Sequence, residues 1–173
     1  MTPFVEWRQP AVAARVYATC ATPLGEAALI RERGPRTRPE DHADAVESWT
    51  VSLRDGEASL TVHRLAADPL WLRWRIWKGF EGEADGEPFR FGGTSALRRS
   101  RRSVTYEGTS IDVRIVPRAF SLRLLERGEE VGFRSFSDRW VLPDPTDHAV
   151  LAICLFEWAG LEDLLRTPLL RDL

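Results

Sequence analysis

The chain has 173 residues, with 24 lysines and arginines against 26 aspartates and glutamates, and its formal charge is -2. This near balance excludes a general nucleic-acid binder, which carries an excess of basic residues. The length fits one domain with its own hydrophobic core, so we predict a single domain over residues 1–173.

Alternating apolar and polar residues recur between residues 14 and 142 and predict strands joined by short hairpins. Three of these hairpins turn at Asp55-Gly56, Glu107-Gly108 and Arg127-Gly128. Another strand is predicted over residues 70–77, and the shorter runs bring the total to about twelve strands. Because the connections are short, we expect the strands to be antiparallel.

The end of the chain predicts a helix over residues 147–165. Pro143 and Pro145 end the last strand, and Asp144 between them can cap the helix. The run Ala149 to Phe156 has no polar stripe, so it must be buried on every side. We therefore predict a mainly β (α+β) fold, a closed antiparallel β-barrel of about twelve strands around this central hydrophobic helix. A helix clamped between two sheets, or buried at a dimer interface, remains the alternative.

Many antiparallel strands followed by a C-terminal apolar helix form a familiar order. Asp147, the run Ala149 to Phe156, Glu157 and Leu161 resemble the closing helix of the tubby-like superfamily, which includes the LURP-one-related proteins and the phospholipid scramblases. The resemblance implies a twelve-stranded barrel around a hydrophobic helix. It also implies phosphoinositide or membrane-surface binding, as in tubby proteins. The chain lacks the proline-rich N-terminal region and the calcium-binding segment of the scramblases, so scramblase activity is not expected.

The densest basic cluster is formed by Arg98, Arg99, Arg101 and Arg102. Arginine binds phosphate groups through two parallel hydrogen bonds, so this cluster is our first candidate for contact with a lipid headgroup or a phosphorylated ligand. Glu81, Glu83, Asp85 and Glu87, in a predicted loop, could instead neutralise it. The cluster could also be a solvated edge that resists aggregation.

Arg73 and Arg75 alternate with Trp71 and Trp77 and are the second candidate for ligand binding. Aromatic rings interleaved with cations are typical of surfaces that meet nucleic acid or a membrane interface. Cation-π packing on the outer face of a barrel explains the same pattern.

No catalytic residue, metal site or cofactor is predicted. His42, with acidic neighbours, is a weak metal pattern on its own. Cys154 lies in the apolar run and is read as a core residue, whereas Cys20, near a turn, is expected to be exposed. The absence of CxxC spacing, a signal sequence and a membrane-spanning run predicts reduced thiols in a cytoplasmic protein.

The sequence thus favours a non-enzymatic tubby-like binding or scaffold module that contacts an anionic lipid, a membrane surface or a phosphorylated ligand through its arginines. The alternative is a protein-interaction or structural domain without a small ligand, in which Trp71 and Trp77 meet a protein partner or a second copy in a homodimer. An enzyme is disfavoured because no catalytic motif is visible, and specific nucleic-acid binding is not expected.

Overall fold

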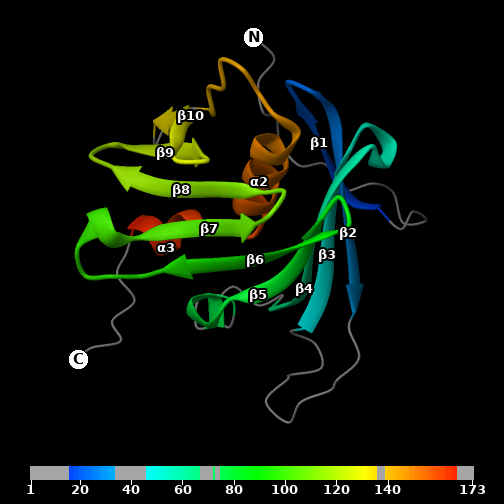
Figure 1. Cartoon of the computed structure of the whole chain (residues 1–173), viewed down its shortest axis with the longest axis horizontal. Coiled ribbons are helices and arrows are strands. Elements are labelled where there is room, and N and C mark those ends of the chain that lie inside the picture. Colours follow the sequence, from blue (N-terminus) through cyan, green and yellow to red (C-terminus); the bar gives the residue numbers. More distant parts are fainter. Residues whose placement is uncertain (1–15, 34–45, 67–71, 73–74, 136–138, 167–173) are drawn as a thin grey trace.

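A computed structural model describes residues 16–33, 46–66, 72, 75–135 and 139–166. Within these residues, one ten-stranded antiparallel sheet follows the chain in the order β1 to β10 (Figure 1). Its strands are β1 (Val16–Thr22), β2 (Gly25–Arg33), β3 (Val46–Leu53), β4 (Ala58–Ala66), β5 (Phe80–Ala84), β6 (Glu87–Thr94), β7 (Ser103–Gly108), β8 (Asp112–Arg118), β9 (Ser121–Glu126) and β10 (Glu129–Ser135).

The three predicted hairpins are confirmed, although only one has a two-residue turn. Glu126 pairs with Glu129, and both residues between them have a positive φ, 51° at Arg127 and 83° at Gly128. This is the turn geometry that matches the twist of antiparallel strands. The other two loops are longer: Leu53 pairs with Ala58 and Glu107 with Asp112.

The sheet is open, so the prediction of a closed barrel of about twelve strands is wrong. Within the described residues, β1 pairs with β2 and β10 pairs with β9. On the other side of β10, Phe133 forms an isolated bridge with Val141. The end strands β1 and β10 are not paired with each other. Figure 1 shows why closure is unnecessary: the sheet curves around α2 (Asp147–Trp158), with β1 to β4 on one side and β6 to β8 on the other.

The burial predicted for the apolar helix is confirmed. Every residue from Ala149 to Phe156 is buried, and Tyr106 of β7 donates a hydrogen bond to the Ala152 carbonyl at 2.9 Å. Burial raises the pKa of Tyr106 well above its usual value. Trp140 meets the Phe156 ring at 6.2 Å between centroids, so chain outside the sheet also covers the helix.

The helix is shorter than predicted at one end and is capped by a different residue at the other. Thr146, not Asp144, accepts a hydrogen bond from the Ala149 backbone N–H at 3.2 Å. At the C-terminal end, Gly160 has a φ of 63°, and the Leu161 N–H bonds to the Phe156 carbonyl at 3.2 Å. This left-handed cap ends α2, and the short α3 (Glu162–Arg166) follows.

The strand predicted over residues 70–77 is not present in the part of this segment that the structure describes. Leu72 and Arg75 are helical, and a 3-10 turn covers Ile76–Lys78. Leu72 and Ile76 are both buried, and their spacing of four residues places them on one face of a helix. The apolar residues that suggested a strand are therefore of two kinds. Leu72 and Ile76 lie on the buried face of a helix, and Trp77 is exposed.

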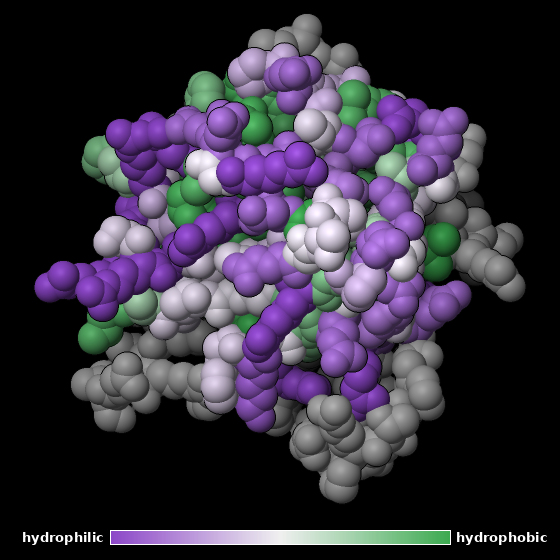
Figure 2. Space-filling model, in the orientation of Figure 1, coloured by the Kyte–Doolittle hydropathy of each residue, from purple (hydrophilic) through white to green (hydrophobic). Residues whose placement is uncertain are grey.

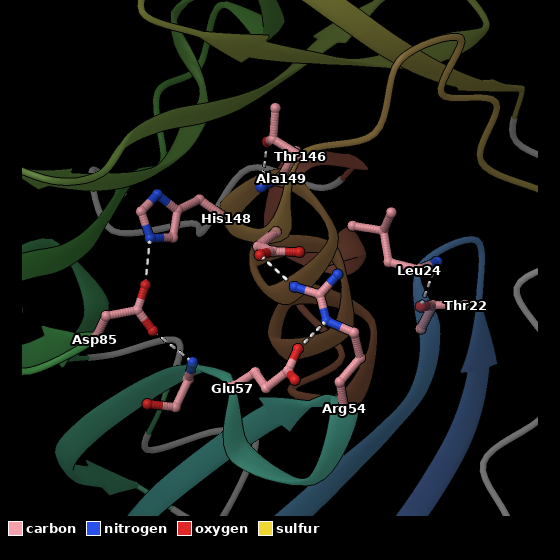
Figure 3. A network of polar contacts seen from close by, with 10 residues as sticks. Thr22, Leu24, Arg54, Glu57, Asp85, Thr146, His148 and Ala149 are labelled. Atoms are coloured by element: carbon pink, nitrogen blue, oxygen red, sulfur yellow. Dashed lines mark hydrogen bonds and ion pairs between the residues drawn. The ribbon is translucent and has the colours of Figure 1, made fainter.

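Polar contacts hold the N-terminal end of α2 against two hairpin loops (Figure 3). Arg54 bonds to Asp147 at 2.6 Å and to Glu57 at 3.0 Å. His148 lies 3.0 Å from Asp85, whose other oxygen accepts the Ser59 backbone N–H at 2.7 Å. The loop after β3 and the turn after β5 are thus tied to the helix.

Two arginines from strands serve the opposite end of α2. Arg134 of β10 bonds to Glu157 at 2.6 Å, and Trp140 donates to the same carboxylate at 2.7 Å. On the other side, the Arg31 guanidinium stacks on the rings of Trp49 and Trp158 at 5.2 and 5.0 Å. The last turn of α2 has no basic residue of its own, and both of these guanidinium groups come from strands.

Candidate functional site

The predicted arginine cluster lies in the connection between β6 and β7. Thr94 and Ser103 are the last paired residues of these strands, so residues 95–102 project from one end of the sheet. A 3-10 turn over Arg99–Arg101 shapes the connection, and the Arg101 N–H bonds to the Arg98 carbonyl at 2.9 Å. The four arginines are close in sequence, but their side chains have different environments.

Arg102 points into the protein and is only 4% exposed. Its guanidinium donates to four backbone carbonyls, those of Ala96, Leu97, Leu165 and Arg166, at 2.7 to 3.1 Å. Burial, and to a lesser extent the charge of Arg99, lowers the pKa of Arg102. These bonds join the β6–β7 connection to the end of α3, so we assign Arg102 a structural role and leave it out of the site.

Arg98 and Arg101 are exposed, and among the described residues neither side chain has a hydrogen bond or an ion pair. Arg99 is half-buried and makes a contact of its own. The neighbouring Leu97 is 70% exposed. The connection therefore presents two unpaired cations beside an apolar side chain.

The turn between β8 and β9 lies at the same end of the sheet. Val104 of β7 pairs with Ile115 of β8, so the last residues of β8 continue past the start of β7. This places Arg118 and Phe120, which is 84% exposed, next to the arginine connection. We call the five exposed residues the basic end: Leu97, Arg98, Arg101, Arg118 and Phe120. The β6–β7 and β8–β9 connections lie at the left in Figure 1. In the same orientation, Figure 2 shows long hydrophilic side chains projecting from the left side of the molecule, with small hydrophobic areas beside them.

A groove of about 280 Å³ lies on the outer face of β6, β7 and β8 and reaches the basic end at Thr94 and Ser103. Trp77, 50% exposed, lines it, and Gly92 of β6 leaves room in it, whereas a Cβ at the neighbouring Gly93 would meet Ile76 and Leu164. The full lining is Trp77, Gly79, Arg90, Gly92, Gly93, Thr94, Ser103, Thr105, Glu107 and Arg114.

Two arginines against one glutamate, Glu107, give this groove a net positive charge. Arg90 is held by a hydrogen bond to the Lys78 carbonyl at 2.7 Å and packs over Gly79, where a Cβ would come within 2.4 Å of the Arg90 Nε. Arg114 makes a long bond of 3.4 Å to the Ser103 hydroxyl. Neither arginine is in an ion pair with a carboxylate of the described residues. Neither residue was among the candidates predicted from the sequence, although each faces outward on an alternating strand, which is the signal that could have found them.

Of the second pair of predicted site residues the structure describes only Arg75, which does not lie at this end. Arg73 lies outside the described residues. Arg75 is half-buried, with its guanidinium 5.9 Å from the Phe80 ring centroid. It lines a smaller hollow of about 120 Å³, together with His63, Arg64 and Glu81.

The acidic residues expected to neutralise the arginine cluster lie elsewhere. Glu81 and Glu83 face outward on β5 rather than lying in a loop, and Asp85 is in the turn that follows. Glu83 lies 3.6 Å from His63, and Asp85 is engaged by His148. No ion pair among the described residues joins these acids to Arg98 or Arg101.

Within the described residues, no three His, Cys, Asp or Glu side chains gather as a metal site would require, and the segment around His42 lies outside them. No helix in this part of the chain is long and apolar enough to cross a bilayer.

Comparisons with protein families, with curated proteins and with solved structures found no significant match. The tubby-like resemblance therefore stays a prediction.

Proposed function

We propose that this protein is a non-enzymatic binding module that docks reversibly on an anionic lipid surface through its basic end. One observation carries the proposal: Leu97 and Phe120 are exposed at 70% and 84%, at the same end of the sheet as the exposed, unpaired Arg98 and Arg101. Apolar tips flanked by cations can insert between headgroups while the cations meet lipid phosphates.

The expected affinity is modest. An arginine near an anionic membrane contributes about 1 kcal/mol, and burying each apolar tip contributes about 1.5 kcal/mol. Arg98, Arg101, Leu97 and Phe120 then give about 5 kcal/mol, before the entropic cost of docking. Such binding is weak, reversible and sensitive to salt. The groove with Arg90 and Arg114 begins beside the tip, where a phosphorylated headgroup can enter it.

The proposal includes no catalysis. Among the described residues, His148 and Asp85 make the shorter of the two histidine–carboxylate contacts, and such a contact could act as an acid–base pair. The Asp85 carboxylate, however, also accepts the Ser59 backbone N–H and so ties a hairpin to the helix. A binding role is in line with the membrane-surface function that the tubby-like resemblance implies.

The test is vesicle flotation at low salt and at ~0.5 M salt. The vesicles are phosphatidylcholine alone and phosphatidylcholine mixed with phosphatidylserine. We expect the wild type to float only with the mixed vesicles and to be released by salt. Replacing Arg98 and Arg101 by Gln together removes about 2 kcal/mol and lowers the partition coefficient roughly 30-fold.

A matched control removes one exposed arginine at the opposite end of these strands. Arg127 lies in the β9–β10 turn, so Arg127→Gln changes the net charge as much as Arg101→Gln alone and should retain most of the binding. Leu97→Ser with Phe120→Ser should weaken binding at low salt and leave its salt dependence unchanged, because insertion of apolar side chains is not screened. A wild type with no salt-dependent affinity for anionic vesicles would sink the proposal.

A protein-interaction domain is the competing function, and the exposed Trp77 on the groove wall favours it. Binding of that kind should not respond to lipid charge, so the same flotation experiment separates the two.

A further inference from the structure

Two thiols that are distant in sequence meet inside the protein. Cys20 of β1 and Cys154 of α2 are 134 residues apart, yet their sulfur atoms lie 3.8 Å from each other. Both side chains are buried, with 5% and 2% of their surface exposed. The core position predicted for Cys154 is confirmed, whereas the exposure expected for Cys20 is wrong because its side chain faces α2 across the inner side of the sheet.

The pair is the full cysteine content of the chain. Two small apolar residues that are buried independently need not touch in a core of this size. Burial therefore does not by itself explain the contact between the two sulfur atoms. Bond formation requires the sulfurs to approach from 3.8 Å to about 2.05 Å. A rotation about one Cα–Cβ bond moves a sulfur by more than that difference.

We propose that Cys20 and Cys154 are a redox site. The two cysteines form a reversible disulfide with each other when they react with a small disulfide such as oxidised glutathione. In the first step the Cys20 sulfur attacks one sulfur of oxidised glutathione, forms a mixed disulfide and releases one glutathione thiol. In the second step Cys154 attacks the Cys20 sulfur and releases the second glutathione. Two protein thiols are oxidised, one small disulfide is reduced, and the two protons end on the two glutathione thiols.

The geometry also orders the two cysteines. Cys20 lies on an end strand that pairs with β2 alone among the described strands, so local opening of this edge exposes it at low cost. Cys154 lies in the middle of the buried helix and becomes reachable only from within. The hydrogen bond between the thiols lowers the pKa of Cys20, while that bond and burial raise the pKa of Cys154 well above its usual value. Cys20 is therefore the attacking thiol and Cys154 the resolving one.

The bond would change the protein at its open edge. It would tie β1 to the central helix and close a loop spanning the 134-residue separation. Long loops lose the most unfolded-state entropy when they are cross-linked, so the oxidised form should melt about 5 °C or more above the reduced form.

The test equilibrates the folded, reduced protein with mixtures of reduced and oxidised glutathione. Free thiols are then counted after acid quenching and denaturation, and the intact mass is measured. We expect a monomer that loses about 2 Da and both titratable thiols, and that is restored by dithiothreitol. Cys154→Ser should accumulate a glutathione adduct on Cys20, whereas Cys20→Ser should resist modification. Cys154→Ala provides the same trap if the serine variant does not fold.

The wild type alone can overturn the inference. Two thiols that remain titratable after prolonged oxidation of the folded protein, or bonds that form only between chains, would contradict it. An adduct on Cys154 rather than Cys20 would contradict the assigned order.

Discussion

Arg98, Arg101 and Arg102 lie within five residues of one another, and burial decides which of them can meet a ligand. The guanidinium of Arg102 donates hydrogen bonds to four backbone carbonyls. Its charge therefore organises the β6–β7 connection and the end of α3 from within. The two exposed arginines stand on the scaffold that the buried one holds in place.

This division predicts opposite results for neighbouring substitutions. Arg102→Gln should lower the free energy of unfolding by about 2–4 kcal/mol, because hydrogen bonds from a charged group are lost and buried carbonyls remain unsatisfied. Arg101→Gln, one residue earlier, should change stability by less than about 0.5 kcal/mol. Urea denaturation followed by tryptophan fluorescence measures both. Equal effects in the two variants would contradict the structural role of Arg102.

Sequence reasoning located the arginine cluster but could not separate its members. Alternation along a strand predicts which side chains face inward, and it succeeds for β7 and β8. Residues 95–102 form an irregular connection without a period, so the inward turn of Arg102 depends on carbonyls of α3, which lie more than sixty positions away along the chain. The approach of Cys20 to Cys154 is hidden for the same reason, since tertiary contacts of this range leave no local pattern.

At the scale of the element, α2 illustrates what hydrophobic patterning can establish. A run of eight residues without a polar stripe, Ala149 to Phe156, does require burial on every side, and the structure satisfies it. The hydrophobic pattern does not indicate which elements cover the helix. It also failed over residues 70–77, where buried positions two or four residues apart fit a strand and a helix equally well and the described part is helical.

The helix is the most sensitive element of the fold. Ile153 is fully buried, so Ile153→Asp places a carboxylate in an apolar core at a cost of several kcal/mol. A domain of this size has about 5–15 kcal/mol to lose, and we expect the variant to be insoluble or unfolded. Ile153→Val, which costs about 1 kcal/mol, is the matched control. Circular dichroism of the soluble fraction decides the outcome, and a cooperatively melting aspartate variant would contradict the burial of α2.

At the scale of the whole molecule, the difference between an open sheet and a barrel lies in two strands that do not meet. The prediction of closure assumed that a helix buried on all sides needs a continuous wall. A strongly curved sheet covers most of α2, and Trp140 adds cover from outside the sheet. Hydrophobic patterning indicates which faces of the elements are buried. It carries no information on whether β1 and β10 pair, so it could not distinguish an open sheet from a closed barrel.

An open sheet predicts uneven protection of its backbone, and hydrogen exchange measured by mass spectrometry can detect it. Strand β6 is hydrogen-bonded to a neighbour on both sides, whereas β1 is hydrogen-bonded to β2 alone within the described residues. Peptides covering β1 should therefore exchange roughly 10-fold or more faster than peptides covering β6, because amides at an unpaired edge open without global unfolding. The disulfide proposed above should slow exchange in β1 and leave β6 unchanged, since it fixes only the edge. Equal protection of β1 and β6 in the reduced protein would mean that the sheet closes in solution.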